Sequence, residues 1–198
     1  MTVVKICGVT RPADAEAAAR AGADLIGIIL WAPSPRSVDR AGARRVREAI
    51  PGGVEAVGVF VDEDPDLVAK LIEELRLDRV QLHGSESPAV VERFGQRALR
   101  GVRDGDASSV PAGVPVVFDR AFGERPSPEA RRAHWAAARA LGRERQVLLA
   151  GALDAGTVAE AVRQAAPYGV DTARGVESSP GIKDHEAIRR FVEAAKGA

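Results

Sequence analysis

The sequence predicts an α/β protein whose parallel strands close into a barrel. Eight short apolar runs rich in Val, Ile or Leu occur along the chain, and most are separated by segments of helical character. Because parallel strands need a crossover and a helix is the usual one, this alternation predicts a parallel sheet. Eight units favour closure over an open sheet, and no Pro- or Ser-rich linker divides the 198 residues. We therefore expect one domain over residues 1–198, a single (β/α)8 or TIM barrel.

The expected elements follow in chain order. The first helix begins near Thr10, which can cap it; Pro12 suits its first turn, and Gly22 ends it. The connection over 104–113 contains Gly105 and Pro111, so we expect at most one helical turn there. The eight strands are expected at 3–7, 25–30, 55–61, 79–83, 98–102, 115–119, 146–150 and 169–173. Further helices are expected at Asp39–Ile50, Asp66–Leu75, Ser87–Phe94, Pro128–Leu141, Gly156–Ala166 and Asp184–Ala195.

Composition narrows the class of function. The 28 Lys and Arg balance the 28 Asp and Glu, which argues against binding of nucleic acid or an anionic membrane through bulk charge, although a local basic pocket remains open. One cysteine and three scattered histidines fit no common metal site, so we expect no metal. The first residues lack the pattern of a secretion signal, and no apolar run approaches the ~18 residues of a membrane span, so we expect a cytoplasmic protein.

Polar residues stand where several strands end. Active sites of such barrels lie at the carboxyl ends of the strands. With period-two alternation, Cys7, His83 and Asp119 point toward the barrel mouth, and Lys5 lies one layer below Cys7. The alternate positions, which should face the helices, are apolar: Val4, Ile6, Val80, Leu82 and Phe118.

Each of these side chains has a structural and a chemical interpretation. A lone cysteine in a strand is usually a small buried hydrophobe, but at a strand end its thiolate can act as a base if a nearby cation such as Lys5 lowers its pKa. Asp119 can cap the next segment or transfer a proton. His83 can hydrogen-bond a loop carbonyl or bind substrate.

Anion-binding candidates lie in three loops. Two prolines stiffen the loop that carries Arg36, whose guanidinium can bind a carboxylate through two parallel hydrogen bonds or lie in solvent. Glycines in the last two loops, at Gly151 and Gly175, let backbone N–H groups approach an anion, although turns need glycine as well. Because barrels often bind phosphate after strands seven and eight, these loops are a candidate phosphate site.

Six ordered motifs give a family resemblance that runs from Lys5 nearly to the end of the chain. They are KICGVT at 5–10, SPRSV at 34–38, VGVFVDE at 57–63, QLHGSE at 81–86, FDR at 118–120 and GVESSPGIKD at 175–184. Together they resemble the phosphoribosylanthranilate isomerases, barrel enzymes of tryptophan biosynthesis. The resemblance implies an Amadori rearrangement of N-(5-phosphoribosyl)anthranilate into an aminoketose, without cofactor or metal, by a monomer or homodimer.

The resemblance also implies residue roles. Cys7 resembles the general base and Asp119 the general acid, while Arg36 resembles the clamp for the substrate carboxylate. His83 and Asp171 resemble further pocket residues, and the loops of Gly151 and Gly175 resemble the phosphate site. This chemistry requires a lowered pKa at Cys7 and a raised pKa at Asp119.

The sequence departs from the family pattern in two places. The stretch after Asp119 retains one glycine, Gly123, where such enzymes have several. The usual glycine pair after strand seven is Gly151-Ala152, and Ala173-Arg174 replaces small polar residues, so Arg174 can bind phosphate or point to solvent. Two alternatives stay open: another phosphosugar-converting barrel enzyme, and a non-catalytic barrel that binds phosphoanions.

Overall fold

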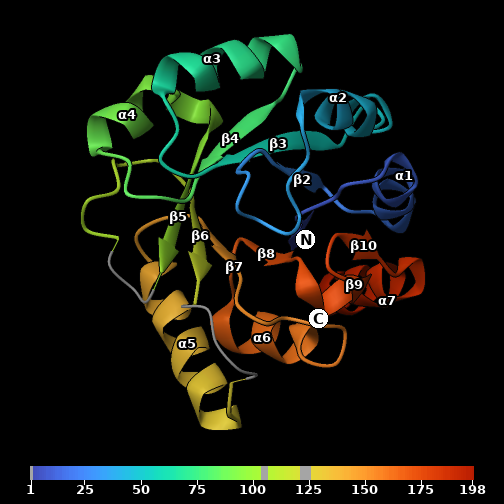
Figure 1. Ribbon diagram of the computed structural model, residues 1–198. Helices are drawn as coiled ribbons and strands as arrows, with labels where there is room; N and C mark the ends of the chain where they lie inside the picture. Colours follow the sequence, from blue (N-terminus) through green and yellow to red (C-terminus); the bar gives the residue numbers. More distant parts are fainter. Residues whose placement is uncertain (1, 104–106, 121–125) are drawn as a thin grey trace.

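A closed barrel of eight parallel strands forms the centre of the molecule (Figure 1). The computed structural model describes residues 2–103, 107–120 and 126–198. The strands follow one another in chain order, and β8 pairs with β1 to close the barrel, with Lys5 opposite Asp171. In Figure 1 the helices surround the strands. This arrangement confirms the predicted (β/α)8 barrel.

The observed elements match the expected ones closely. The barrel strands are β1 (Val3–Ile6), β2 (Leu25–Ile29), β3 (Glu55–Phe60), β4 (Arg79–Leu82), β5 (Ala98–Arg103), β6 (Val116–Asp119), β7 (Val147–Leu149) and β8 (Gly169–Thr172). The helices are α1 (Pro12–Ala21), α2 (Arg40–Glu48), α3 (Pro65–Glu74), α4 (Pro88–Arg93), α5 (Pro128–Leu141), α6 (Val158–Ala165) and α7 (His185–Lys196).

Two features were not expected. After β8 the chain forms a short 3₁₀ turn at Arg174–Val176 and then a hairpin of β9 (Glu177–Ser179) and β10 (Ile182–Lys183). Another 3₁₀ turn at Gly95–Arg97 precedes β5. Of the weak connection over 104–113, residues 107–113 form turns without a helix, and 104–106 lie outside the described residues.

The start of α1 differs from the prediction. Arg11, not Thr10, is the residue that precedes the helix, and no side chain caps it. The Thr10 hydroxyl donates instead to the carbonyl of Gly181 in the β9–β10 turn. Gly22 ends α1 as expected, with φ of 94° in the left-handed region that favours glycine. Short polar side chains cap other helices, for example Asp39 at α2 and Asp184 at α7.

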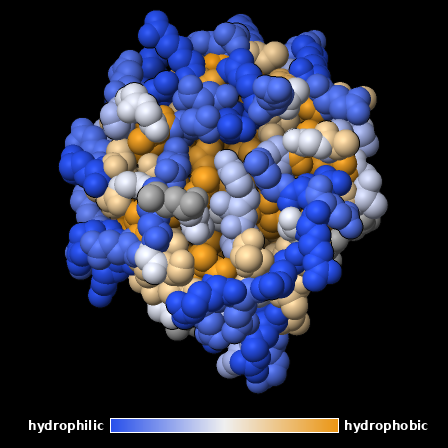
Figure 2. Space-filling view, turned by 180° about the vertical axis from the view of Figure 1, so that it is seen from behind, coloured by the Kyte–Doolittle hydropathy of each residue, from blue (hydrophilic) through white to orange (hydrophobic). Residues whose placement is uncertain are grey.

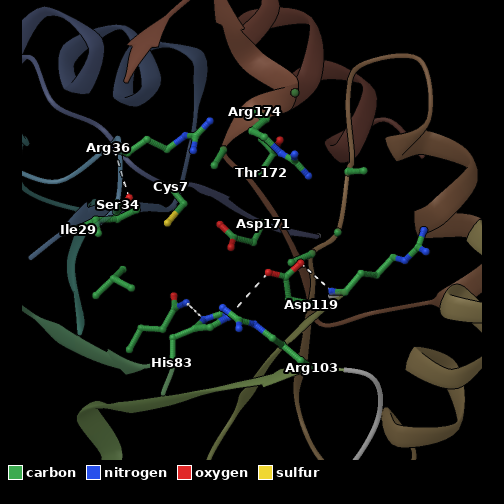
Figure 3. A pocket seen from close by; sticks show the side chains of 18 of the residues that line it. Cys7, Ile29, Ser34, Arg36, His83, Arg103, Asp119, Asp171, Thr172 and Arg174 are labelled. Atoms are coloured by element: carbon green, nitrogen blue, oxygen red, sulfur yellow. Dashed lines mark hydrogen bonds and ion pairs between the residues drawn. The ribbon is translucent and has the colours of Figure 1, made fainter. Parts of the chain in front are cut away.

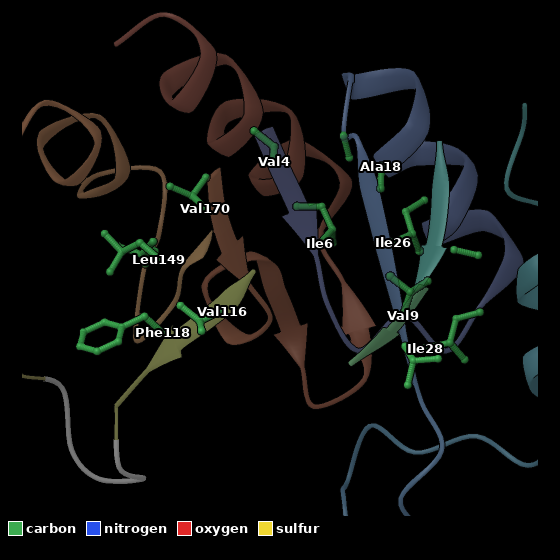
Figure 4. Packing of buried hydrophobic residues seen from close by; sticks show 14 of the residues in the cluster. Val4, Ile6, Val9, Ala18, Ile26, Ile28, Val116, Phe118, Leu149 and Val170 are labelled. Atoms are coloured by element: carbon green, nitrogen blue, oxygen red, sulfur yellow. The ribbon is translucent and has the colours of Figure 1, made fainter. Parts of the chain in front are cut away.

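Alternation along the strands divides the core into two layers. Inside the barrel, Val57, Leu99 and Val117 belong to a small cluster that fills its lower part. The alternate residues of the strands point outward and pack against the helices, as Figure 4 shows for Val4, Ile6 and Ile26. The inward and outward positions inferred from the sequence are therefore confirmed for β1. Inward-facing side chains beyond the inner cluster face the barrel mouth.

The surface is mostly polar. Among the described residues, Tyr168 is the one large hydrophobic side chain classed as exposed. On the face shown in Figure 2, hydrophobic residues are visible mainly between hydrophilic ones. No helix in the described part of the chain is long and apolar enough to cross a membrane.

A buried carboxylate joins the two ends of the chain. Asp14 in α1 is fully buried and accepts hydrogen bonds from the Arg11 guanidinium, the His185 ring and the backbone N–H of Lys183. Burial opposes its ionisation, but these bonds outweigh burial and hold the pKa of Asp14 below its ordinary value. The ionised carboxylate therefore ties α1 to β10 and α7.

We predict that Asp14→Asn lowers the free energy of unfolding at pH 7 by about 3 kcal/mol, because it removes one partner of a buried charged network. The folded-state pKa is depressed, so this stabilisation is complete above the unfolded pKa of about 3.9 and is lost as pH falls through the folded pKa. Urea unfolding at several pH values measures both effects. Glu16→Gln, on an exposed position of the same helix, should change stability by less than about 0.5 kcal/mol. Equal losses in the two variants would contradict the assignment.

Candidate active site

A pocket opens at the carboxyl ends of the barrel strands (Figure 3). Every strand or the loop directly after it contributes to its lining, and all seven site residues expected from the sequence are in it. They are Cys7, Arg36, His83, Asp119, Gly151, Asp171 and Gly175.

Cys7 lies at the end of β1, above a buried ion pair. Lys5 Nζ donates to Asp171 Oδ1 at 3.1 Å, and the Lys5 side chain is fully buried. Gly27 in the neighbouring strand β2 makes room for both residues: a Cβ at this position would stand 2.8 Å from the Cys7 sulfur and 3.2 Å from Lys5 Nζ. A larger residue at position 27 would therefore displace the thiol.

The pKa of Cys7 is shifted in the direction opposite to the one that this chemistry requires. Burial raises the pKa of the Cys7 thiol, and the Lys5 ammonium and the more distant Lys183 only partly offset it. Asp171 opposes them by repelling a thiolate. Lys5 itself remains charged, because Asp171 and Cys7 outweigh burial and raise its pKa to about 12. The expected lowering of the Cys7 pKa is wrong, since a fully enclosed thiolate loses more hydration than one shared cation returns.

Asp119 lies at the end of β6. Burial raises the pKa of its carboxyl group, and repulsion by Asp171 adds to the increase, although the backbone N–H of Arg120 donates to it. The direction agrees with the expectation for a proton donor. Asp171, whose charge acts on both Cys7 and Asp119, lies between them in Figure 3.

His83 is held as a neutral ring. Burial, together with the charges of Arg103 and Lys5, lowers its pKa to about 4. Gln81 Nε2 lies 2.8 Å from His83 Nδ1; because an amide nitrogen donates, the ring proton is on Nε2, which lies 3.8 Å from Asp119 Oδ2. Gly101 in β5 leaves space for this ring, since a Cβ there would overlap it. His83 therefore bonds a side chain, not a loop carbonyl.

Among the described residues, the same contact leaves a buried acceptor of Gln81 unpaired. Gln81 is buried and lines the pocket, and within the described part of the chain its Oε1 has no hydrogen-bond partner. An unpaired buried carbonyl costs free energy relative to one that accepts a hydrogen bond.

Arg36 reaches the pocket rim from the loop after β2. Its stem packs against Gly8, where a Cβ would stand 2.8 Å from Arg36 Cδ. Its guanidinium donates from Nε and Nη2 to both carboxylate oxygens of Glu177 in β9, at 2.7–3.1 Å. The solvent-exposed alternative is wrong, because only 14% of the side chain is accessible.

The two glycine loops lie next to each other after the neighbouring strands β7 and β8. Gly151 and Ala152 both have positive φ, 94° and 59°, and so form a concave turn of backbone N–H groups. Between described residues, no hydrogen bond uses the N–H of Gly151, Ala152 or Arg174. An added Cβ on Gly175 would overlap the Leu153 carbonyl, so this glycine permits the two loops to touch. Arg174 is in the lining, and its charge acts on Asp119.

Sequence reasoning missed several lining side chains, among them Arg103 and Trp31. Arg103 pairs in register with Asp119, and Trp31 follows β2. Extending the fifth strand by one residue would have placed Arg103 among the strand ends. Residues 121–125 of the stretch after Asp119, including Gly123, lie outside the described residues.

Comparisons with known proteins agree on one family. Residues 4–194 match the model of the family N-(5'phosphoribosyl)anthranilate (PRA) isomerase. A relative named N-(5'-phosphoribosyl)anthranilate isomerase from Halorhodospira halophila is 43% identical over 199 residues, covering 96% of this chain and 95% of the relative. The crystal structure of phosphoribosyl anthranilate isomerase from Thermotoga maritima superposes with a TM-score of 0.90 at 30% identity, over all of both chains. A crystal structure of such an isomerase with reduced 1-(o-carboxyphenylamino)-1-deoxyribulose 5-phosphate superposes with a TM-score of 0.84 at 29% identity, again over all of both chains.

We predict that Cys7 is a thiol at neutral pH. Because burial raises its pKa, thiolate ultraviolet absorbance should increase only at a pH above the ordinary value of about 8.5. A pH titration of the native protein measures this step, and Cys7→Ser, which leaves no cysteine, should remove it. A step near pH 7 would show that Lys5 outweighs burial.

Proposed function

The chain belongs to the N-(5'-phosphoribosyl)anthranilate isomerase family of tryptophan biosynthesis, and we propose that Cys7 and Asp119 carry out its Amadori rearrangement as general base and general acid. The observation that supports this assignment is a proton donor and a proton acceptor in one pocket, between an anion-binding rim and an arginine. The substrate is N-(5-phosphoribosyl)anthranilate, and the product is 1-(2-carboxyphenylamino)-1-deoxyribulose 5-phosphate.

Asp119 acts first, as the acid. Its carboxyl group donates a proton to the ring oxygen of the furanose, and the lone pair of the anilino nitrogen displaces that oxygen from C1 of the sugar. The C–O bond breaks, an iminium forms, and the ring oxygen becomes a hydroxyl. The raised pKa of Asp119 supports this role, since it keeps more of the carboxyl group protonated at a given pH.

Cys7 then acts as the base. Its thiolate removes the proton from C2 of the sugar, and the electron pair of that C–H bond forms the C1–C2 double bond while the iminium nitrogen is neutralised. The resulting enolamine tautomerises to the ketone. One proton leaves Asp119 and one arrives at Cys7, so the sum of the two steps is an isomerisation.

The productive state combines protonated Asp119 with ionised Cys7. Burial raises both pKa values, which favours this state at Asp119 and opposes it at Cys7. Lys5 supports it, because its ammonium stays charged beside Cys7.

The other site residues bind the two ends of the substrate. Arg36 binds the anthranilate carboxylate, and the loops of Gly151 and Gly175 bind the phosphate through backbone N–H groups. Asp171 contacts the sugar, and neutral His83 donates from Nε2 to a substrate oxygen. Arg174 adds positive charge on the phosphate side.

The organisation proposed for the protein is simple. The whole chain serves as one catalytic domain, works without a cofactor or metal, and acts on a small phosphorylated substrate as a monomer or homodimer in the cytoplasm. The phosphorylated aminoketose analogue bound to the related isomerase supports the substrate class.

The direct test is a fluorescence assay with freshly generated phosphoribosylanthranilate, whose fluorescence should fall above the spontaneous rate. Cys7→Ser and Asp119→Asn should each lower kcat by roughly 100- to 10,000-fold, because each removes one positioned proton-transfer group. KM should change little in either variant. An inactive wild type would favour another phosphosugar enzyme or a non-catalytic barrel, and near wild-type turnover in either variant would remove that residue from the mechanism.

The pH profile of kcat/KM gives these variants separate signatures. The reaction needs ionised Cys7 and protonated Asp119, so kcat/KM should fall on the acid side, where Cys7 is protonated, and on the alkaline side, where Asp119 is ionised, which gives a bell. Cys7→Ser should therefore remove the acid-side fall, and Asp119→Asn the alkaline-side fall. Loss of the opposite limb in either variant would contradict the assignment of base and acid.

We predict that inorganic phosphate inhibits competitively with substrate, because the backbone N–H groups of the glycine loops bind phosphate whatever sugar is attached. Arg174→Ala should raise its inhibition constant about tenfold through the loss of one charged contact. Arg163→Ala, at an exposed position on α6, is the matched control and should leave the constant unchanged. An equal constant in wild type and Arg174→Ala would mean that the backbone alone holds the phosphate.

A further inference from the structure

Glu177 is a buried carboxylate that binds two cationic side chains, Arg36 and Lys183. Only 5% of its side chain is accessible. It accepts from the Arg36 guanidinium through both oxygens, from Lys183 Nζ at 2.8 Å and from the backbone N–H of Gly181 at 3.2 Å. Glu177 and Lys183 are opposite each other in the β9–β10 hairpin. The assigned acid, base and phosphate site do not include this residue.

The bonds to Glu177 use one edge of the Arg36 guanidinium. A guanidinium offers five N–H groups in a plane, with one fork formed by Nε and an Nη and a second fork formed by the two Nη groups. Glu177 occupies the Nε–Nη2 fork. Within the described residues, no hydrogen bond uses Arg36 Nη1. The second fork is therefore available to a second carboxylate.

The charges of the cluster favour an incoming anion. Two cations, Arg36 and Lys183, share the single carboxylate of Glu177, so the group carries one net positive charge. Burial opposes ionisation of Glu177, but the hydrogen bonds from Arg36 and Lys183 outweigh it and hold its pKa below the ordinary value. Lys183 also donates to the carbonyl of Ala173, directly before Arg174 in the phosphate loop.

We propose that Glu177 is a positioning residue: it fixes Arg36 so that the free Nη1–Nη2 fork faces the substrate carboxylate, and through Lys183 it sets this clamp at a constant distance from the phosphate loop. The inference deepens the proposed function and rests on it. One chain of hydrogen bonds, from Arg36 through Glu177 and Lys183 to Ala173, thus fixes the distance between the binding sites for the two anionic ends of the substrate.

Two simpler roles lead to different outcomes. If Glu177 only fastens the hairpin, its loss lowers stability and affects all ligands equally. If Glu177 only reduces the positive charge of Arg36 and Lys183, its loss leaves these two cations unpaired and strengthens carboxylate binding. A positioning role weakens the binding of ligands that carry the ring carboxylate and leaves other ligands unaffected.

The test is equilibrium binding of two unreactive ligands, 1-(2-carboxyphenylamino)-1-deoxyribitol 5-phosphate and its phenylamino counterpart without the carboxylate. Titration calorimetry compares wild type, Glu177→Gln and the control Glu55→Gln. Glu55 forms a similar two-bond pair with Arg79, at the amino-terminal ends of the strands. Wild type should prefer the carboxylate ligand, and Glu177→Gln should lose about tenfold or more of that preference, because an amide N–H then faces Arg36 or Lys183. Glu55→Gln should retain it.

Further variants keep the outcome decisive. Glu177→Asp keeps the charge but shortens the side chain, so it should fold and still lose part of the preference. In an Arg36→Ala background, Glu177→Gln should have no further effect on the preference. An unchanged or increased preference in Glu177→Gln or Glu177→Asp would overturn the positioning role even if the isomerase assay succeeds. Because binding needs no turnover, the binding constants of the two ligands can be compared even if the isomerase assay fails. A failed assay would overturn the proposed reaction only.

Discussion

The buried ion pair between Lys5 and Asp171 is the constraint on which the pocket depends. The two residues are opposite each other in β1 and β8, so the strand pairing that closes the barrel also brings them together. Neither charge reaches water easily, and each is stable there only because of the other. Such a pair is weak evidence for stability, but it fixes a cation under Cys7 and an anion between Cys7 and Asp119. Closure of the fold and the electrostatics of the site are thus set by the same contact.

The pKa values of the site residues depend more on burial than on any single charged neighbour. Burial is the largest influence on the pKa of Cys7, Asp119 and His83, and in each case it favours the neutral form. Burial therefore favours the protonated acid that the proposed reaction needs at Asp119 and opposes the thiolate that it needs at Cys7. Glycines at 27 and 101 make this enclosure possible, because the thiol and the imidazole occupy the space that their side chains would fill.

Sequence periodicity predicted what depends on local pattern. Strand order, the inward phase of Lys5 and Cys7 and the placement of Asp119 all follow from alternation and chain order. Periodicity could not predict contacts between distant segments. Thr10 bonds Gly181 and does not cap its own helix, and Arg36 bonds Glu177, which lies 141 positions later in the sequence. The direction of the Cys7 pKa also required the structure, because a sequence shows that Lys5 is near but not how completely water is excluded.

The local distribution of charge likewise depends on the fold and not on composition alone. The whole sequence has a formal net charge of zero, which excluded bulk attraction of polyanions. The barrel nevertheless collects Arg36, Arg103, Arg120 and Arg174 around the described pocket, against Asp119 and Asp171. Burial raises the pKa of Asp119, and His83, with a pKa of about 4, is neutral near pH 7. In the proposed function, these cations attract a ligand that has a phosphate at one end and a carboxylate at the other, and the spacing of the two proposed anion sites selects its length.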